Sequence, residues 1–452
     1  MSKLVRIANG QGFWGDSIDA PVHLVEAGGI DYLTLDYLAE VTLSIMQKQR
    51  RKDPNLGYAT DFVDLMKRVL PQLKAKGIRV VANAGGVNPE ACRAAVLEVA
   101  RKLGVTGLKI ATVTGDDVLA RLPEFQKQGL KLANMDTGEG LFDAPRDILS
   151  ANVYLQTQAM VDALDTGADI VLTGRCTDPG LTLAPLIHEF QWAADDWNRL
   201  AAGTIAGHIL ECGAQSTGGN FSRWWEVPEL WKVGYPIAEV SDDGTFVITK
   251  HQGTGGMVTV NTVSEQLLYE MGDPHNYITP DVVADFTSIR LEQEGPDRVR
   301  VFGITGKPRT PFLKVSGAYL GGYKATGQLT LSGPRALEKA QLCADIVWKR
   351  LKAAGFEYQH TDAEFLGSSV VHAGIAPAPA DPAEIVMRLS VKDPDRKKVE
   401  RFGREMAPLV TAGPAGVTGF AGGRPKAQEI VAYWPALLPR ELVTWQVSTA
   451  EV

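Results

Sequence analysis

Several short segments that follow apolar runs of the sequence combine glycine with small polar residues. Glycine lets the backbone approach a ligand closely, and successive backbone N–H groups attract an anion. We therefore expect these segments to meet in one pocket for a small anionic substrate. The expected substrate-binding residues are Asn9, Gly10, Asn83, Gly85, Gly86, Thr217, Gly218, Gly219, Thr254, Gly255 and Gly256.

Four side chains close to these segments have the chemistry for proton transfer or for orienting a substrate. His251 precedes the glycine-rich loop GTGG and is the preferred general acid–base, with Asp36 as the second candidate. Arg175 is expected to hold a substrate carboxylate through its forked guanidinium. Asp178 is the fourth catalytic candidate. Alternative roles are helix capping for Asp36 and Asp178, and an ordinary loop position for His251.

His208 and Glu211 are three residues apart, so a helix would place both on one face. This spacing suits a metal pair, or a base with its orienting partner. The pattern HxxE is common by chance, and no metal site is assigned from it. A metal-dependent hydrolase or aldolase that uses His208, Glu211 and Asp36 stays open as an alternative.

No cofactor is assigned from the sequence. The segment NGQGFWGD has the spacing GxGxxG, but Phe13 and Trp14 are bulky where a dinucleotide-binding turn needs small residues. The phosphate-binding pattern GxxxxGK[ST] does not occur. A nicotinamide or flavin reaction is therefore less favoured than a reaction without redox change.

The elements that must position these residues alternate between strand and helix in the first half of the chain. A helix is predicted over Pro89–Leu103, with Asn88 as its N-cap and Gly104 at its end. Strands joined by helices favour a mainly parallel sheet, with ligands beyond the carboxyl ends of its strands. The predicted strands are Leu4–Ala8, Tyr32–Leu35, Ile78–Ala82, Leu108–Val113 and Ile170–Leu172, with a weaker one at Leu130–Ala133.

The second half shows longer, alternating strands after a tryptophan-rich stretch between Asn220 and Asp242. We predict two domains, a parallel α/β domain over 1–225 and a two-layer α/β sandwich over 226–452. Leu313–Tyr319 and Ala325–Leu331 flank the turn-like YLGGYK and are predicted to form a hairpin. The other predicted elements are strands at Phe246–Lys250, Arg298–Phe302, Phe356–Leu366, Glu384–Val391 and Ala427–Trp434, and helices at Pro334–Ala354 and Arg396–Pro408.

Composition limits the classes of function. The 452 residues carry a net charge of −7, which argues against a nucleic-acid partner. No apolar run is long enough for a transmembrane helix, and the N-terminal sequence does not resemble a signal peptide. The four cysteines form no CxxC pair. A cytoplasmic location is expected.

Several segments resemble the acyclic terpene utilisation A family. They are NGQGFWGD, DYLTLDYLAEVTLSI, VVANAGGVNPE, ADIVLTGRCTDPGLTLAPLIHEFQW, AGHILECGAQSTGGNF, ITKHQGTGGMVTVNTVSEQLLYEMGDP and YLGGYKATG. The resemblance implies a catabolic role beside acyl-CoA and carboxylate metabolism. Some family members carry an extra C-terminal domain that is missing here, so the resemblance also implies a small, separately encoded partner protein.

The sequence as a whole predicts a catabolic enzyme of the α/β class. The expected type is a lyase, a hydratase or dehydratase acting on a small carboxylate or its CoA thioester, in a homo-oligomer. Its mechanism would be proton abstraction next to a carbonyl group. The alternatives are a non-catalytic or partner-dependent subunit and the metal-dependent enzyme.

Overall fold

The computed structural model describes residues 3–39, 41–419 and 422–452, and its contacts divide the chain into two units. Unit 1 comprises Met1–Ala318 together with Tyr433–Val452, and unit 2 comprises Tyr319–Ala432. This division differs from the expected one at residue 225. The strands after the tryptophan-rich stretch join the sheet that begins at the N-terminus, so no boundary lies there.

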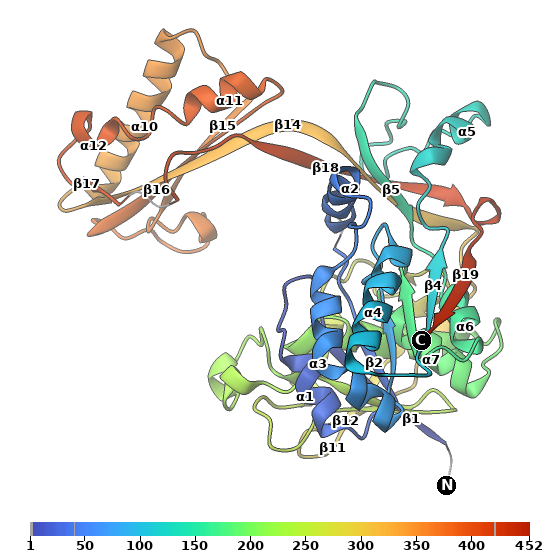
Figure 1. Cartoon of the computed structure of the whole chain (residues 1–452). Helices are drawn as coiled ribbons and strands as arrows, with labels where there is room; N and C mark the ends of the chain where they lie inside the picture. Colours follow the sequence, from blue (N-terminus) through green and yellow to red (C-terminus); the bar gives the residue numbers. More distant parts are fainter. Residues whose placement is uncertain (1–2, 40, 420–421) are drawn as a thin grey trace. The chain divides into compact units, whose positions relative to one another are not determined.

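Five parallel strands form the centre of unit 1 (Figure 1). They lie in the order β1, β2, β3, β6, β4, and each neighbouring pair is parallel. Leu33, for example, lies opposite Ala8 on one side and Val80 on the other. The predicted parallel α/β sheet is thereby confirmed. The bounds are β1 Leu4–Gln11, β2 Tyr32–Leu35, β3 Arg79–Ala82, β4 Lys109–Thr114 and β6 Ile170–Thr173.

Antiparallel strands extend this sheet at both edges, so that the sheet has ten strands among the described residues. One group continues from β1, and the last strand of the chain pairs with β4. The added strands are β7 Ile237–Ser241, β8 Phe246–Thr249, β12 Arg298–Phe302, β11 Arg290–Gly295 and, beside β4, β19 Gln446–Glu451.

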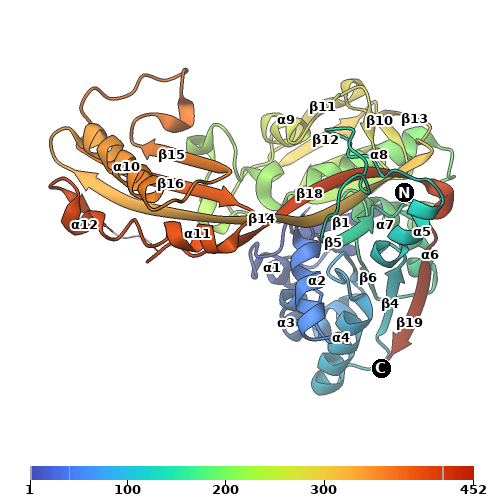
Figure 2. The same cartoon turned by 90° about the horizontal axis from the view of Figure 1, so that it is seen from above.

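Helices cover both faces of the parallel strands (Figures 1 and 2). One set of helices connects the strands from β1 to β4, and a second set connects β4 to β6 and β6 to β7. Because the two sets cross the sheet in opposite directions, right-handed crossovers place them on opposite faces. The first set is α1 Ala20–Ala27, α3 Thr60–Lys76 and α4 Pro89–Leu103, and the second is α6 Gln158–Asp165, α7 Gly180–Phe190 and α8 Trp197–Leu210. Helix α4 matches its prediction, with the Asn88 side chain accepting a hydrogen bond from the Ala91 N–H.

Shorter elements complete unit 1. The weak strand predicted at Leu130–Ala133 is irregular in the structure. A separate three-stranded sheet has the order β13, β10, β9. The elements are α2 Thr42–Lys52, α5 Leu122–Lys127, β5 Ile148–Val153, α9 Val260–Leu268, β9 Tyr277–Ile278, β10 Val283–Asp285 and β13 Thr305–Lys307.

The predicted hairpin at YLGGYK is instead one continuous strand, β14, which runs from Phe312 to Ser332. Its two halves do not pair with each other, because each finds a partner elsewhere. The half that begins at Tyr323 pairs with β16 (Glu384–Asp393), and β14 also pairs with β5 and with β18 (Gln428–Pro439). The hairpin prediction was therefore wrong.

Unit 2 places helices against one face of an antiparallel sheet. The sheet has the order β15, β16, β14, β17. Alternate residues of β16 are buried in a core shared with α10, and the residues between them are more exposed. The elements are β15 His360–Leu366, β17 Val417–Thr418, α10 Ala336–Ala353, α11 Arg396–Phe402 and α12 Leu409–Ala412.

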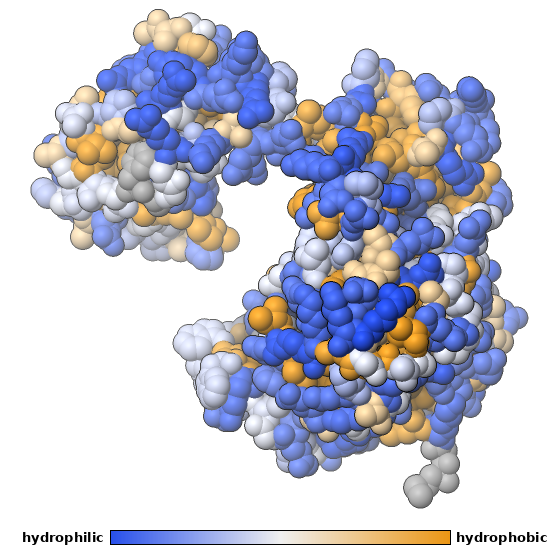
Figure 3. Space-filling view, viewed as in Figure 1, coloured by the Kyte–Doolittle hydropathy of each residue, from blue (hydrophilic) through white to orange (hydrophobic). Residues whose placement is uncertain are grey.

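Hydrophilic residues cover most of the face seen in Figure 3, with small groups of hydrophobic residues between them. Among the helices described, none combines the length and apolar character needed to cross a lipid bilayer.

Candidate functional site

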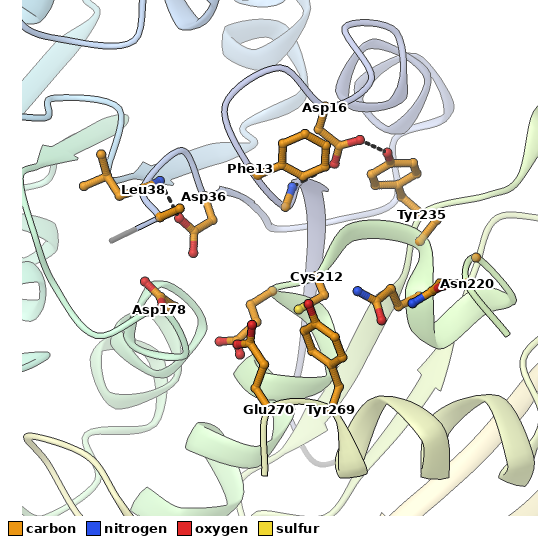
Figure 4. A pocket seen from close by; sticks show the side chains of 16 residues that line it. Phe13, Asp16, Asp36, Leu38, Asp178, Cys212, Asn220, Tyr235, Tyr269 and Glu270 are labelled. Carbon is orange, nitrogen blue, oxygen red and sulfur yellow. Dashed lines mark hydrogen bonds between the residues drawn. The ribbon is translucent and has the colours of Figure 1, made fainter. Parts of the chain in front are cut away.

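A cavity of about 460 Å³ opens in unit 1 beyond the carboxyl ends of β1, β2 and β6 (Figure 4). This is the edge where open parallel sheets bind ligands. We call it the acidic cavity. Its lining residues are Gly12, Phe13, Asp16, Asp36, Leu38, Ala39, Asp178, Glu211, Cys212, Ala214, Gln215, Gly219, Asn220, Tyr235, Tyr269 and Glu270.

Carboxyl groups dominate the polar lining of the acidic cavity. Asp16, Asp36, Asp178, Glu211 and Glu270 all contribute to it, and among the described residues no lysine, arginine or histidine does. The side chains of Asp36, Asp178 and Glu270 point toward a common space (Figure 4). A wall of this charge repels a free carboxylate, so the geometry does not favour the anionic pocket expected from the sequence.

Asp36 is held at the end of β2 by a small network of hydrogen bonds. Its Oδ1 accepts the Leu38 N–H at 3.0 Å and the Asn83 side-chain amide at 2.6 Å. The Asn83 Oδ1 in turn accepts the Tyr37 N–H at 2.7 Å. Asn83, which was expected to bind substrate, instead joins the ends of β2 and β3 and fixes the orientation of Asp36.

Arg175 lies behind the cavity wall and is only 1% exposed. Its Nη1 donates to the Leu38 carbonyl and its Nε to the Cys176 carbonyl, both at 2.8 Å, and its Nη2 pairs with Asp178. The guanidinium also lies 4.6 Å from the ring centroid of Tyr154. Arg175 therefore connects the loops that follow β2 and β6 and balances the charge of Asp178. This is a positioning role, in place of the expected contact with substrate.

His208 and Glu211 form a hydrogen-bonded pair at the end of α8. The His208 Nε2 lies 3.1 Å from the Gln266 carbonyl, which can only accept, so this nitrogen carries a proton. The His208 Nδ1 lies 3.1 Å from the Glu211 Oε1. One further proton must lie between these two atoms for the contact to be a hydrogen bond. Tyr277 and Phe286 pack edge-on against the imidazole and shield it from solvent.

Glu211 lines the cavity wall, and its second oxygen is enclosed by the protein. Its side chain is 12% exposed, and among the described residues its Oε2 has no hydrogen-bond partner. Burial raises the pKa of Glu211, the hydrogen bond and charge of His208 oppose that rise, and the negative charges of Asp36 and Glu270 add to it. The raised pKa favours the protonated form of the Glu211 carboxyl group.

Other lining residues supply hydrogen-bond donors, and two of them form a hydrogen-bonded pair in the cavity wall. Gln215 and Asn220 bring carboxamide groups to the wall. The Tyr235 hydroxyl donates to the Asp16 Oδ1 at 2.7 Å, and this pair closes one end of the cavity. Cys212 also lines the wall, but burial raises the pKa of its thiol to about 12, so it is a poor nucleophile.

His251 lies in a different cavity, of about 570 Å³, together with Thr254. We call it the His251 cavity. It shares Tyr235 with the acidic cavity. The structure therefore separates His251 from Asp36, the two residues proposed from the sequence as alternative proton carriers, and it places Asp36 with Asp178 and Glu211.

The glycine-rich turns do not converge in one pocket. Gly219 lines the acidic cavity and Gly86 lines a third cavity near the start of α4. The N–H groups of Gly255 and Gly256 donate to backbone carbonyls of Lys232 and Pro228. Those two amides are used within the protein and cannot form the expected nest for an anion.

The remaining expected binding residues have structural contacts. Thr217 is buried, and its hydroxyl donates to the carbonyls of Ala214 and Gly234. The N–H groups of Gly218 and Gly219 donate to nearby carbonyls of the same turn. Asn9 and Gly10 lie within β1. A Cβ on Gly85 would overlap Pro89 and the Thr173 carbonyl, so this glycine allows the close packing of β3, β6 and α4.

Sequence reasoning missed several residues of the acidic cavity. Asp16 closes the segment NGQGFWGD, and its position after a parallel strand was a usable signal. No comparable signal exists for Tyr235, Tyr269 and Glu270, because they are far in sequence from the parallel strands whose ends form the cavity. Glu211 was identified only together with His208, as a metal pair or as a base with its orienting partner. Within the described residues, no three His, Cys, Asp or Glu side chains are placed to share a metal ion.

Comparisons with known proteins agree with the segments quoted above. No curated protein and no solved structure matched the chain. The model of one protein family matches residues 5–449, and this match spans both units. The chain therefore belongs to the family described as acyclic terpene utilisation family protein AtuA.

Proposed function

We propose that this chain is a catabolic lyase of the hydratase or dehydratase type, in which carboxyl groups move the proton. Membership of a family named for acyclic terpene utilisation supports the catabolic role. The observation that carries the reaction type is Glu211, a carboxyl group that lines the acidic cavity, is hydrogen-bonded to His208 and has a pKa raised by burial. General acid–base catalysis is most efficient when the acid holds its proton near the working pH.

In this proposal, Asp36 and Glu211 have different roles in proton transfer. In the hydration direction, Asp36 accepts a proton from water while the water oxygen bonds to the β-carbon of an unsaturated acyl group. Glu211 gives its proton to the α-carbon, so that one water is added across the double bond. In the reverse direction, the Glu211 carboxylate removes the α-proton, and Asp36 returns a proton to the departing hydroxyl.

The charge of the cavity indicates how the substrate is presented. A free carboxylate next to five carboxyl groups is repelled, whereas a thioester carbonyl is uncharged. The side-chain amides of Gln215 and Asn220 are donors that suit such a carbonyl as its oxygen gains negative charge. We therefore propose an acyl thioester and not the free acid as the substrate.

The test is turnover of α,β-unsaturated acyl-CoA thioesters and of the matching free acids, followed by the loss of enoyl absorbance. The wild-type chain should convert thioesters in preference to acids. Glu211→Gln should reduce the rate by about 10²- to 10⁴-fold, the usual contribution of one general acid. Glu98→Gln, an exposed position on α4, is the matched control and should keep the wild-type rate.

Two outcomes would contradict the proposal. One is a wild-type chain that converts no thioester, and the other is a Glu211→Gln variant that is as active as Glu98→Gln. The metal-dependent alternative is less favoured by the geometry, because both ring nitrogens of His208 have hydrogen-bond partners within the protein.

A further inference from the structure

The His251 cavity has no part in the proton transfer proposed above, yet it is the larger of the two cavities that share Tyr235. One wall is the side of α1 that carries Ala20, Leu24 and Ala27. The opposite wall consists of residues 231–235 and of the loop from His251 to Thr254. Its lining therefore combines apolar groups, the imidazoles of His23 and His251, the cation Lys232 and the carboxylate Asp19.

Trp231 stands at this cavity with 83% of its surface exposed. An exposed indole ring beside a cavity offers a large flat surface on which a planar ligand can stack. Lys232 Nζ lies 5.7 Å from the ring centroid. The ring is otherwise open to a planar ligand.

The backbone around Trp231 is held in a costly conformation. Glu229 has a φ of 48°, which is unfavourable for a residue with a Cβ. A side chain at Gly255 would overlap the Glu229 carbonyl, and the N–H of Gly255 donates to Lys232. Strain that is fixed by surrounding contacts is typical of ligand sites, and here it fixes the position of Trp231.

His251 adds a hydrogen-bond acceptor of defined orientation. Its Nε2 lies 2.9 Å from the Gly28 carbonyl and must donate to it. Burial lowers the pKa of His251, which favours the neutral ring. In a neutral histidine whose Nε2 carries the proton, Nδ1 is a hydrogen-bond acceptor. Among the described residues, the Nδ1 of His251 has no hydrogen-bond partner.

We propose that the His251 cavity binds the adenine ring of a nucleotide, stacked on Trp231 and recognised through its amino group by His251 Nδ1. Every base has a face that stacks on an aromatic ring, and the accepting nitrogen selects a base that presents an N–H donor there. The ammonium group of Lys232, which pairs with the Glu229 carboxylate at 2.9 Å, is the charge that suits the phosphate groups that accompany the ring. The nucleotide is either free or the nucleotide end of a CoA thioester. The second case rests on the proposed function, whereas the first does not.

Binding of AMP, IMP, CoA and pantetheine to the full chain, measured by calorimetry, tests the proposal without any need for turnover. AMP and CoA should bind, and IMP, which has a carbonyl oxygen in place of the amino group, should bind more weakly. Trp231→Ala should weaken AMP binding by about 5- to 150-fold, the effect of losing one stacking partner. Trp224→Ala is the matched control, because Trp224 is 63% exposed but does not line the cavity.

The outcomes separate this site from the proposed reaction. Glu211→Gln should bind AMP as the wild type does, whatever its activity. Binding of AMP together with CoA identifies a thioester site, and binding of AMP without CoA identifies a free-nucleotide site. The proposal is overturned if AMP does not bind, if IMP binds as tightly as AMP, or if Trp231→Ala and Trp224→Ala bind AMP equally well.

Discussion

The acidic cavity and the His251 cavity meet at Tyr235 but differ in their chemistry. The first has five carboxyl groups and no basic side chain among the described residues. The second contains Lys232, two histidines and an exposed tryptophan. The first cavity holds Glu211, whose pKa is raised by burial, and the second holds His251, whose pKa is lowered by burial.

The comparison also shows what supports each cavity. The acidic cavity depends on strand ends that Arg175 and Asn83 connect from behind. The His251 cavity depends on a helix face and on loops fixed by backbone hydrogen bonds. Three changes, from the largest expected effect to the smallest, test this difference.

Removing the arginine behind the acidic cavity should have the largest effect on stability. Arg175→Met leaves two carbonyls and Asp178 without their donor, and we expect a loss of about 3 kcal/mol in the free energy of unfolding. Urea titration measures it. Arg101→Met, which breaks an exposed pair with Glu98, is the control and should cost less than about 1 kcal/mol. Similar losses for the two variants would show that Arg175 does not hold the cavity wall.

Changing the shared wall should have an intermediate effect. Tyr235→Phe removes the hydrogen bond to the Asp16 carboxylate, which we expect to cost about 1.5 kcal/mol. Tyr433→Phe is the matched control. Among the described residues, the buried hydroxyl of Tyr433 has no hydrogen-bond partner, so its removal should be neutral or stabilising. If both variants were equally stable, the Tyr235–Asp16 pair would not be a structural partition.

The smallest effect is a dependence of stability on pH. Because the pKa of Glu211 is raised on folding, the folded state holds this proton more tightly than the unfolded state. Wild-type stability relative to Glu211→Gln should therefore fall as the pH rises above about 4.3, the ordinary value, with a slope of at most about 1.4 kcal/mol per pH unit. Unfolding in urea at several pH values measures this difference.

Glu189 provides a control of opposite sign. Burial raises the pKa of Glu189, but hydrogen bonds from Lys3 and Tyr32 lower it by a larger amount. The pKa of Glu189 is therefore below the ordinary value. Wild-type stability relative to Glu189→Gln should rise with pH below about 4.3, the range between the lowered pKa and the ordinary value. If the Glu211 and Glu189 differences changed in the same direction, the assignment of a proton to Glu211 would be wrong.

The sequence by itself determined the parallel centre of unit 1 and helix α4. The strands at Tyr32–Leu35 and Ile170–Thr173 are short apolar runs buried on both faces, and local pattern reveals such runs. Asn88, Pro89 and Gly104 mark the ends of α4 through local backbone geometry. Family membership was also visible, because it rests on motifs read along the chain.

Only the tertiary structure decided which turns meet and which carboxyl groups line one cavity. The strand β14 continues through two glycines because distant strands pair with both halves, which no local signal could indicate. The surroundings of Glu211 also depend on distant residues, because Tyr277, Phe286 and Gln266, more than fifty residues away, bury and orient its partner His208. Pairing and burial depend on contacts between distant segments, whereas capping and periodicity depend on neighbours in the sequence.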